Sequence, residues 1–182
     1  MLYIMRHGRT EWNAARKLQG HTDVPLNEEG RQMAEEAAVK YREVPVDICY
    51  CSPLVRAKET AEIVLRGRNT PIVLDERLIE MGFGEYEGVE LNNLPADAPA
   101  NVLFHHPEQY VPGVDGESFT ELYKRTGSFL KEVVEPQLQA GKDVLIVGHG
   151  AMNSSIVCQV KKMPLEQFWE AGIQNCKLMK LL

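Results

Sequence analysis

The sequence predicts a three-layer α/β sandwich, in which helices cover both faces of a mostly parallel central sheet. Short runs of branched apolar residues alternate along the chain with segments of helical spacing, which is typical of layered α/β domains. The chain has 182 residues, 44% of them hydrophobic, and no repeat or low-complexity segment divides it. We therefore expect a single domain over residues 1–182.

Five segments have the composition of strands, because branched apolar residues dominate them. They cover residues 2–6, 46–51, 72–74, 143–148 and 177–182. The last is expected at an edge of the sheet, where it could pair with a second copy of the chain in a homodimer.

Helices are expected between these strands. Asn27 followed by two glutamates is a suitable cap and dipole partner for a helix over residues 27–43. Ser52 and Pro53 resemble an N-cap with proline at the first helical position, which predicts a helix to about residue 66. Two further helices are expected at 117–138 and from Gly150 onward.

Residues 82–116 differ from the rest of the chain. They contain five glycines and four prolines and show little periodicity. Such a segment predicts a long excursion over one end of the sheet, and excursions of this kind in compact domains are often lids.

Charge and cysteine content exclude several classes of protein. With a net charge of -6, the chain has no positive field for nucleic acid or an anionic membrane, so neither is expected as a partner. The apolar start, residues 2–5, is too short for a signal peptide, which favours a cytoplasmic protein. The four cysteines form no C-x-x-C pair, so we expect reduced thiols and no zinc site.

Two histidines stand directly behind predicted strands. His7 lies in R-H-G at 6–8, and His149 lies in G-H-G at 148–150. Because ligands bind at the carboxyl ends of the strands in an open α/β sheet, we expect both imidazoles at one edge of the sheet.

Two arginines and a carboxylate complete a plausible constellation. Arg6 precedes the first histidine, Arg56 lies one turn inside a helix that starts at the same edge, and Glu80 precedes the excursion. Each alone fits a surface role equally well. Together they offer two guanidiniums to clamp phosphate oxygens, two imidazoles and one acid, which is the equipment of phosphoryl transfer. The chain has no Walker A, G-x-S-x-G or H-E-x-x-H motif.

Several motifs in the same order resemble those of the histidine phosphatase superfamily, in its phosphoglycerate-mutase-like branch. The likeness extends from residue 2 to about residue 151. It is carried by R-H-G-R-T-E-W-N at 6–13, Q-G-H-T-D-V-P-L-N-E-E-G at 19–30, C-S-P-L-V-R-A-K-E-T-A at 51–61, E-M-G-F-G-E-Y-E-G at 80–88 and V-G-H-G at 147–150.

The resemblance implies a role for each residue of the constellation. His7 would accept the phosphoryl group, Arg6 and Arg56 would clamp it, His149 would bind it and stabilise the transition state, and Glu80 would donate the proton. The phosphate pocket would be completed by Asn13, Gln19, Gly20 and Gly150. To attack as a neutral imidazole, His7 should hold a proton on one ring nitrogen against a backbone carbonyl.

The expected activity is that of a metal-independent phosphomonoesterase, which acts through a phosphohistidine on a small phosphorylated metabolite. Because the arginines supply fixed positive charge, no metal or other cofactor is expected. Two alternatives remain: a phosphoglycerate mutase, and a weakly catalytic phosphoryl-binding regulatory protein. The mutase is disfavoured because no Lys or Arg lies between Arg77 and Lys124, where the family's mutases carry cations.

Overall fold

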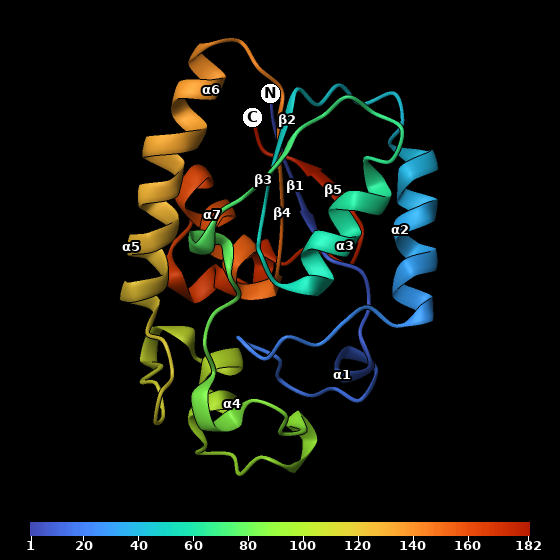
Figure 1. The fold of residues 1–182 in the computed structure, drawn as a ribbon. Helices are drawn as coiled ribbons and strands as arrows, with labels where there is room; N and C mark the ends of the chain where they lie inside the picture. Colours follow the sequence, from blue (N-terminus) through green and yellow to red (C-terminus); the bar gives the residue numbers. More distant parts are fainter.

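The central sheet has five strands, in the order β3-β2-β4-β1-β5 (Figure 1). This computed structural model describes all residues, 1–182. The strands are β1 (Leu2–Arg6), β2 (Ile48–Cys51), β3 (Ile72–Leu74), β4 (Val144–Gly148) and β5 (Leu178–Lys180). The pairs β1–β4, β2–β4 and β2–β3 are parallel, and only β5 runs antiparallel, against β1. The predicted fold class is confirmed.

Helices cover both faces of the sheet. One face packs against α2 (Glu28–Lys40) and α3 (Val55–Val64), and the other packs against α5 (Phe119–Phe129) and α7 (Gly150–Lys161). Alternation along the strands divides the core accordingly: Ile4 and Ile146 lie in one cluster, Met5 and Val147 in the other. Burying each such side chain contributes about 1.5–3 kcal/mol to the stability of the fold. Packing on both faces therefore stabilises the sheet.

The start of α3 differs from the prediction. Leu54 is the N-cap of this helix, so the expectation that Ser52 caps it with Pro53 at the first position was wrong. The Ser52 hydroxyl accepts a local hydrogen bond from Leu54 N at 3.3 Å and also contacts the ring of His149 at 2.7 Å. This side chain therefore combines a local turn with a tertiary contact and does not cap the helix.

The predicted helix 117–138 is interrupted. A capping box at Ser118 starts α5, but residues Leu130–Val134 form a π-helix before α6 (Glu135–Gln139). Pro136 explains the change, because proline lacks the N–H of a regular turn and its ring collides with the carbonyl four residues earlier. The wider π turn accommodates both effects.

The excursion 82–116 contains short helices that its composition did not predict: η2 (Gly84–Tyr86), η3 (Leu91–Asn93), α4 (Pro99–His105) and η4 (Pro107–Gln109). Figure 1 shows it at the end of the sheet opposite the labelled chain ends. It is joined to the N-terminal loop by reciprocal hydrogen bonds, Leu18 N to Val89 O and Gly88 N to Leu18 O. That the excursion works as a lid stays a prediction.

Three shorter elements went unpredicted: α1 (Glu11–Ala14), η1 (Glu76–Leu78) and η6 (Leu165–Ala171). All four cysteine thiols are free and buried, as expected for reduced thiols. None of the helices is both long and apolar enough to cross a membrane.

Candidate active site

The two predicted histidines lie side by side. His7 follows β1 and His149 follows β4, and these strands are parallel neighbours whose register pairs Arg6 with Gly148. Their ring centroids are 5.1 Å apart, and the backbone N–H of His7 donates to Gly148 O at 2.9 Å. The register of the two strands therefore sets the distance between the imidazoles.

One nitrogen of His7 is fixed by its own loop. Its Nδ1 lies 2.6 Å from Gly8 O, and because a carbonyl can only accept, Nδ1 carries the proton of the neutral ring. Burial lowers the pKa of His7 well below 6.5, and the charges of Arg56 and Arg6 lower it further. The ring is therefore neutral near pH 7, with the Nε2 lone pair free.

The loop that carries His7 tolerates only glycine next to it. A Cβ on Gly8 would lie 2.4 Å from Gly30 O, so α2 can approach this closely only because residue 8 has no side chain. Two side chains hold the same loop: Gly8 N donates to Thr60 Oγ1 at 3.0 Å, and Asn175 Nδ2 donates to His7 O at 2.6 Å.

His149 is the N-cap residue of α7 and is fully buried. Its Nε2 contacts Ser52 Oγ, whereas its buried Nδ1 has no hydrogen-bond partner. Burial lowers the pKa of His149 well below 6.5, with Arg56 as the next cause. A neutral ring with one unused nitrogen is thus available beside His7.

Arg56 is buried and ties α3 to the loop 19–22. Its Nη1 donates to Thr22 O at 2.9 Å and its Nη2 donates to Gly20 O at 2.8 Å, whereas the buried Nε has no partner. A buried arginine without an ion pair is costly. Its positive charge is therefore available to an anion at this edge of the sheet.

Arg6 and Glu80 form the other side of the site. The buried Nε of Arg6 has no partner, and burial lowers the pKa of this guanidinium while Glu80 counteracts the shift. Glu80 accepts hydrogen bonds from the backbone N–H groups of Met81, Ala151 and Met152 at 2.8, 3.2 and 2.9 Å. The first turn of α7 therefore fixes the carboxylate beside Arg6.

Arg125 holds the backbone around Glu80. Its guanidinium donates to Ile79 O at 2.7 Å and to Glu80 O at 3.2 Å, and it pairs with Glu117. Glu117 in turn accepts from Gly82 N at 3.1 Å. The backbone on both sides of Glu80 is thus held by one half-buried ion pair.

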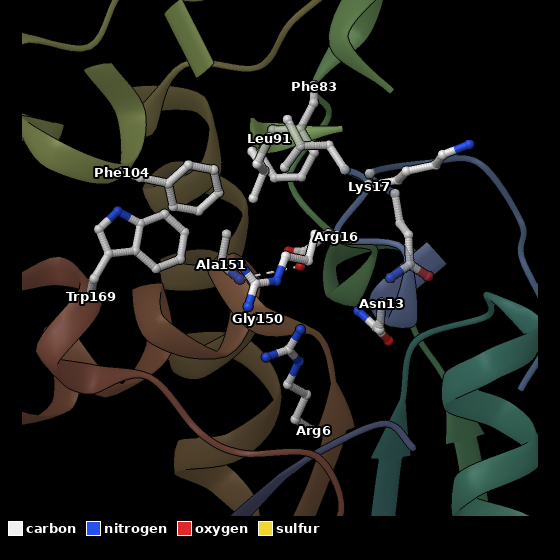
Figure 2. Close-up of a pocket in the computed structure, with 14 residues that line it drawn as sticks. Arg6, Asn13, Arg16, Lys17, Phe83, Leu91, Phe104, Gly150, Ala151 and Trp169 are labelled. Atoms are coloured by element: carbon white, nitrogen blue, oxygen red, sulfur yellow. Dashed lines mark hydrogen bonds between the residues drawn. The ribbon is translucent and has the colours of Figure 1, made fainter. Parts of the chain in front are cut away.

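A cavity of about 360 Å³ opens at this edge (Figure 2). Of the predicted residues, those that line it are Arg6, Asn13, Gln19, Gly20, Glu80 and Gly150. His7, Arg56 and His149 lie deeper and are 2%, 0% and 0% exposed. The structure thus brings all nine predicted residues together at one edge, six of them in the cavity wall and three of them buried.

The cavity wall also contains residues that the predicted site did not include, among them Arg16, Lys17 and Trp169. The cations stand immediately before the L-Q-G segment at 18–20, so their place next to a recognised motif was a usable signal. Trp169 had none, because it belongs to the short helix η6 and reaches the site only through packing.

Four acidic residues of the excursion, Glu90, Asp97, Glu108 and Asp115, do not line the cavity. No group of three or more His, Cys, Asp or Glu side chains is arranged to hold a metal ion.

The chain is similar to several known proteins. A putative phosphoserine phosphatase 2 of Hydrogenobacter thermophilus is 34% identical over 99% of this chain and 88% of its own length. A probable phosphoglycerate mutase GpmB of Escherichia fergusonii is 31% identical over 99% and 83%. The solved structure of YhfR from Bacillus stearothermophilus superposes with a TM-score of 0.87 at 36% identity, covering 97% of this chain and 88% of that one.

The sequence model of one family, described as the histidine phosphatase superfamily (branch 1), matches residues 2–182. This match, together with the phosphatase names among the relatives, confirms the predicted enzyme class, a phosphatase of the histidine type. With its paired histidines at two strand ends and a family match over nearly its whole length, the chain belongs to the histidine phosphatase superfamily.

Proposed function

We propose that the protein is a metal-independent phosphomonoesterase that transfers the phosphoryl group of a small phosphorylated metabolite to His7 and then to water. The observation that carries this proposal is the contact between His7 Nδ1 and Gly8 O. It leaves Nε2 unprotonated in a ring that burial and two arginines keep neutral, which is the state that a nucleophilic imidazole requires.

In the first step, His7 Nε2 attacks phosphorus as the bond from phosphorus to the ester oxygen breaks. The departing oxygen takes the proton of Glu80, so that it leaves as an alcohol. Arg6 and Arg56 offer unpaired, buried Nε–H groups, and His149 has an unused Nδ1. Donors of this kind stabilise the charge that develops on the transferred oxygens.

In the second step, Glu80 removes a proton from water, and the water oxygen attacks phosphorus. The bond from phosphorus to Nε2 breaks, inorganic phosphate leaves, and His7 returns to its starting tautomer. The three backbone N–H groups that hold Glu80 support this role, because they keep one carboxylate in place for both proton transfers. Asn13, Gln19, Gly20 and Gly150 would line the path of the substrate.

Positive charge from the protein replaces the metal ion in this proposal. The fixed guanidiniums of Arg6 and Arg56 neutralise the transferred group, which is the task that a magnesium ion performs in many phosphoryl-transfer enzymes. The buried position of both Nε atoms supports this assignment, since unsatisfied donors at such depth call for an anionic partner.

Phosphoglycerate mutase activity is the second candidate. The names of several relatives favour it, and Arg16 offers a cation for a second anionic group. Against it stands the excursion 82–116, which contains no Lys or Arg. The third possibility, a phosphoryl-binding regulatory protein, would need neither a nucleophile nor an acid.

The test is a metal-free assay of the purified chain with p-nitrophenyl phosphate and a panel of natural monoesters. We expect hydrolysis by the wild type and a loss of kcat on the order of 10³-fold or more in His7→Ala. Rapid quenching with labelled substrate should trap an acid-labile, base-stable phosphoprotein only when His7 is present. His106→Ala is the matched control, because this side chain is 63% exposed and lies outside the cavity wall.

Three results would contradict the proposal. Undiminished hydrolysis by the His7→Ala variant would exclude His7 as the nucleophile. Efficient conversion of 3-phosphoglycerate with its bisphosphate primer, without hydrolysis, would make the chain a mutase. Absence of turnover with every ester, combined with tight phosphate binding, would favour the regulatory protein.

A further inference from the structure

The cavity has an apolar half that phosphate itself does not need. Phe83, Leu91, Phe104 and Trp169 form it, and Figure 2 shows them on the side away from Arg6. The rings of Phe104 and Trp169 lie 4.8 Å apart at 32°. Trp169 Nε1 already donates to Leu103 O at 2.7 Å, so the indole offers a ligand ring surface and no donor.

A further cation of the cavity wall, the Arg16 guanidinium, is not engaged by any protein group. Arg16 lines the wall and takes part in no side-chain hydrogen bond or ion pair. In Figure 2 its guanidinium points into the cavity on the side of Arg6, whereas the Lys17 ammonium points away. The only acid in the wall is Glu80, whose oxygens are engaged by three backbone N–H groups.

The backbone of Arg16 is in an unusual conformation. Its φ is +53°, directly after Ala15, the C-cap residue of α1. Glycine is the usual residue at this point of a helix end, because a side chain in the left-handed region is strained. Arg16 O also accepts from Leu91 N at 3.1 Å, which ties the cation to the apolar wall. A strained arginine in a cavity suggests that its side chain is retained for use.

We propose that Arg16 is a specificity-determining residue that binds a carboxylate on the leaving group, and that the substrate is a phosphomonoester whose alcohol carries both a ring and a carboxylate. The proposal rests on the proposed function, in which Arg6 and Arg56 hold the phosphoryl group. A third guanidinium is then free for a second anion, and a carboxylate matches its paired donors. The ring would pack against Phe104 and Trp169, in a cavity whose size is typical of small-molecule sites.

The experiment compares two aryl esters of the same shape, 4-carboxyphenyl phosphate and 4-carbamoylphenyl phosphate, together with their 3-substituted isomers. We expect the wild type to favour the carboxylate of at least one pair about tenfold in kcat/KM, mostly through KM. Leaving-group reactivity works the other way, since the carboxamide withdraws more electron density. Arg16→Gln should abolish the preference, and Arg16→Lys should keep part of it.

The control variant is Arg42→Gln, which removes the same charge from an exposed arginine outside the cavity wall. It should leave the preference unchanged. Phosphoglycolate, a carboxylate ester without a ring, tests the apolar wall: the wild type should hydrolyse it less well than the aryl carboxylate, and Trp169→Leu should narrow the difference.

The outcomes test the role of Arg16, the ring on the substrate and the phosphatase activity separately. If the aryl esters are hydrolysed but the wild type shows no preference, or if the preference survives in Arg16→Gln, the role of Arg16 is refuted while the phosphatase stands. If phosphoglycolate is hydrolysed as efficiently as the aryl carboxylate, the proposal that the substrate carries a ring is refuted. If no ester is hydrolysed by the wild type, the proposed function fails, and the specificity assignment falls with it.

Discussion

Replacing Thr60 by valine should damage catalysis through a single buried hydrogen bond. Thr60 is fully buried, accepts from Gly8 N at 3.0 Å and donates to Arg56 O at 2.7 Å. Valine has nearly the same shape but leaves the buried Gly8 N–H without a partner, which costs about 1–3 kcal/mol. For a chain of this length, Tm should fall by roughly 2–4 °C per kcal/mol.

The effect on turnover follows from the position of the lost bond. Gly8 O is the partner of His7 Nδ1, so a shift of this loop moves the proposed nucleophile. Misplacement by about 1 Å can cost about 10²-fold in rate, and we expect kcat with p-nitrophenyl phosphate to fall roughly tenfold to a hundredfold. Urea denaturation followed by circular dichroism gives the stability of the same samples.

A second buried threonine provides the control. Thr126 is also fully buried, donates to Leu122 O at 2.8 Å, and accepts from Gln159 Nε2 at 2.8 Å, but it lies between α5 and α7 rather than under the site. Thr126→Val should lose comparable stability and keep kcat. If both variants lose stability and neither loses kcat, the argument that Thr60 positions His7 is refuted.

Two further predictions concern pH and metal removal. The pKa values of His7 and His149 are lowered in the folded protein, so the unfolded state binds more protons below pH 6.5. The free energy of unfolding should therefore be at its full value above that pH and decrease as the pH falls. The decrease should reach up to about 1.4 kcal/mol per pH unit for each histidine. Urea denaturation at pH 5.5 and 7.5 measures this, and an equally steep loss in His7→Ala would contradict the assignment. Dialysis against EDTA should leave kcat unchanged in the p-nitrophenyl phosphate assay, whereas a loss restored by added Mg²⁺ would refute metal independence.

The central strands β1, β2 and β4 could be predicted because they are continuous apolar runs, and such runs are typical of strands that are buried on both faces. The edge strand β3 is equally apolar, yet its Val73 and Leu74 are exposed, so the run alone does not determine burial. Helix boundaries were less predictable where tertiary contacts compete with local signals. Ser52 has the chemistry of an N-cap, yet its hydroxyl accepts from Leu54 N before the helix begins and contacts His149. The local pattern contains no signal for the contact with His149, because that residue follows a different strand.

The same distinction applies to the site. His7, His149, Arg56 and Glu80 stand in motifs tied to strand and helix ends, so topology alone brings them to one edge. Trp169 stands on a short 3₁₀ segment without periodicity and reaches the cavity by packing against Phe104. Pairing of the early loop with the excursion, as in Leu91 N to Arg16 O, is likewise a long-range contact that a linear pattern does not contain.

Glu87 joins the two ends of the cavity. Its carboxylate accepts from the backbone N–H groups of His21, Thr22 and Phe83, and it fills the space that a Cβ on Gly20 would need. The loop that Arg56 binds and the start of the excursion therefore respond together to mutation. Substitutions at the start of the excursion that alter specificity for the leaving group should therefore alter phosphate affinity as well. Changes in specificity should arise more readily at Trp169, because Glu87 does not contact this residue.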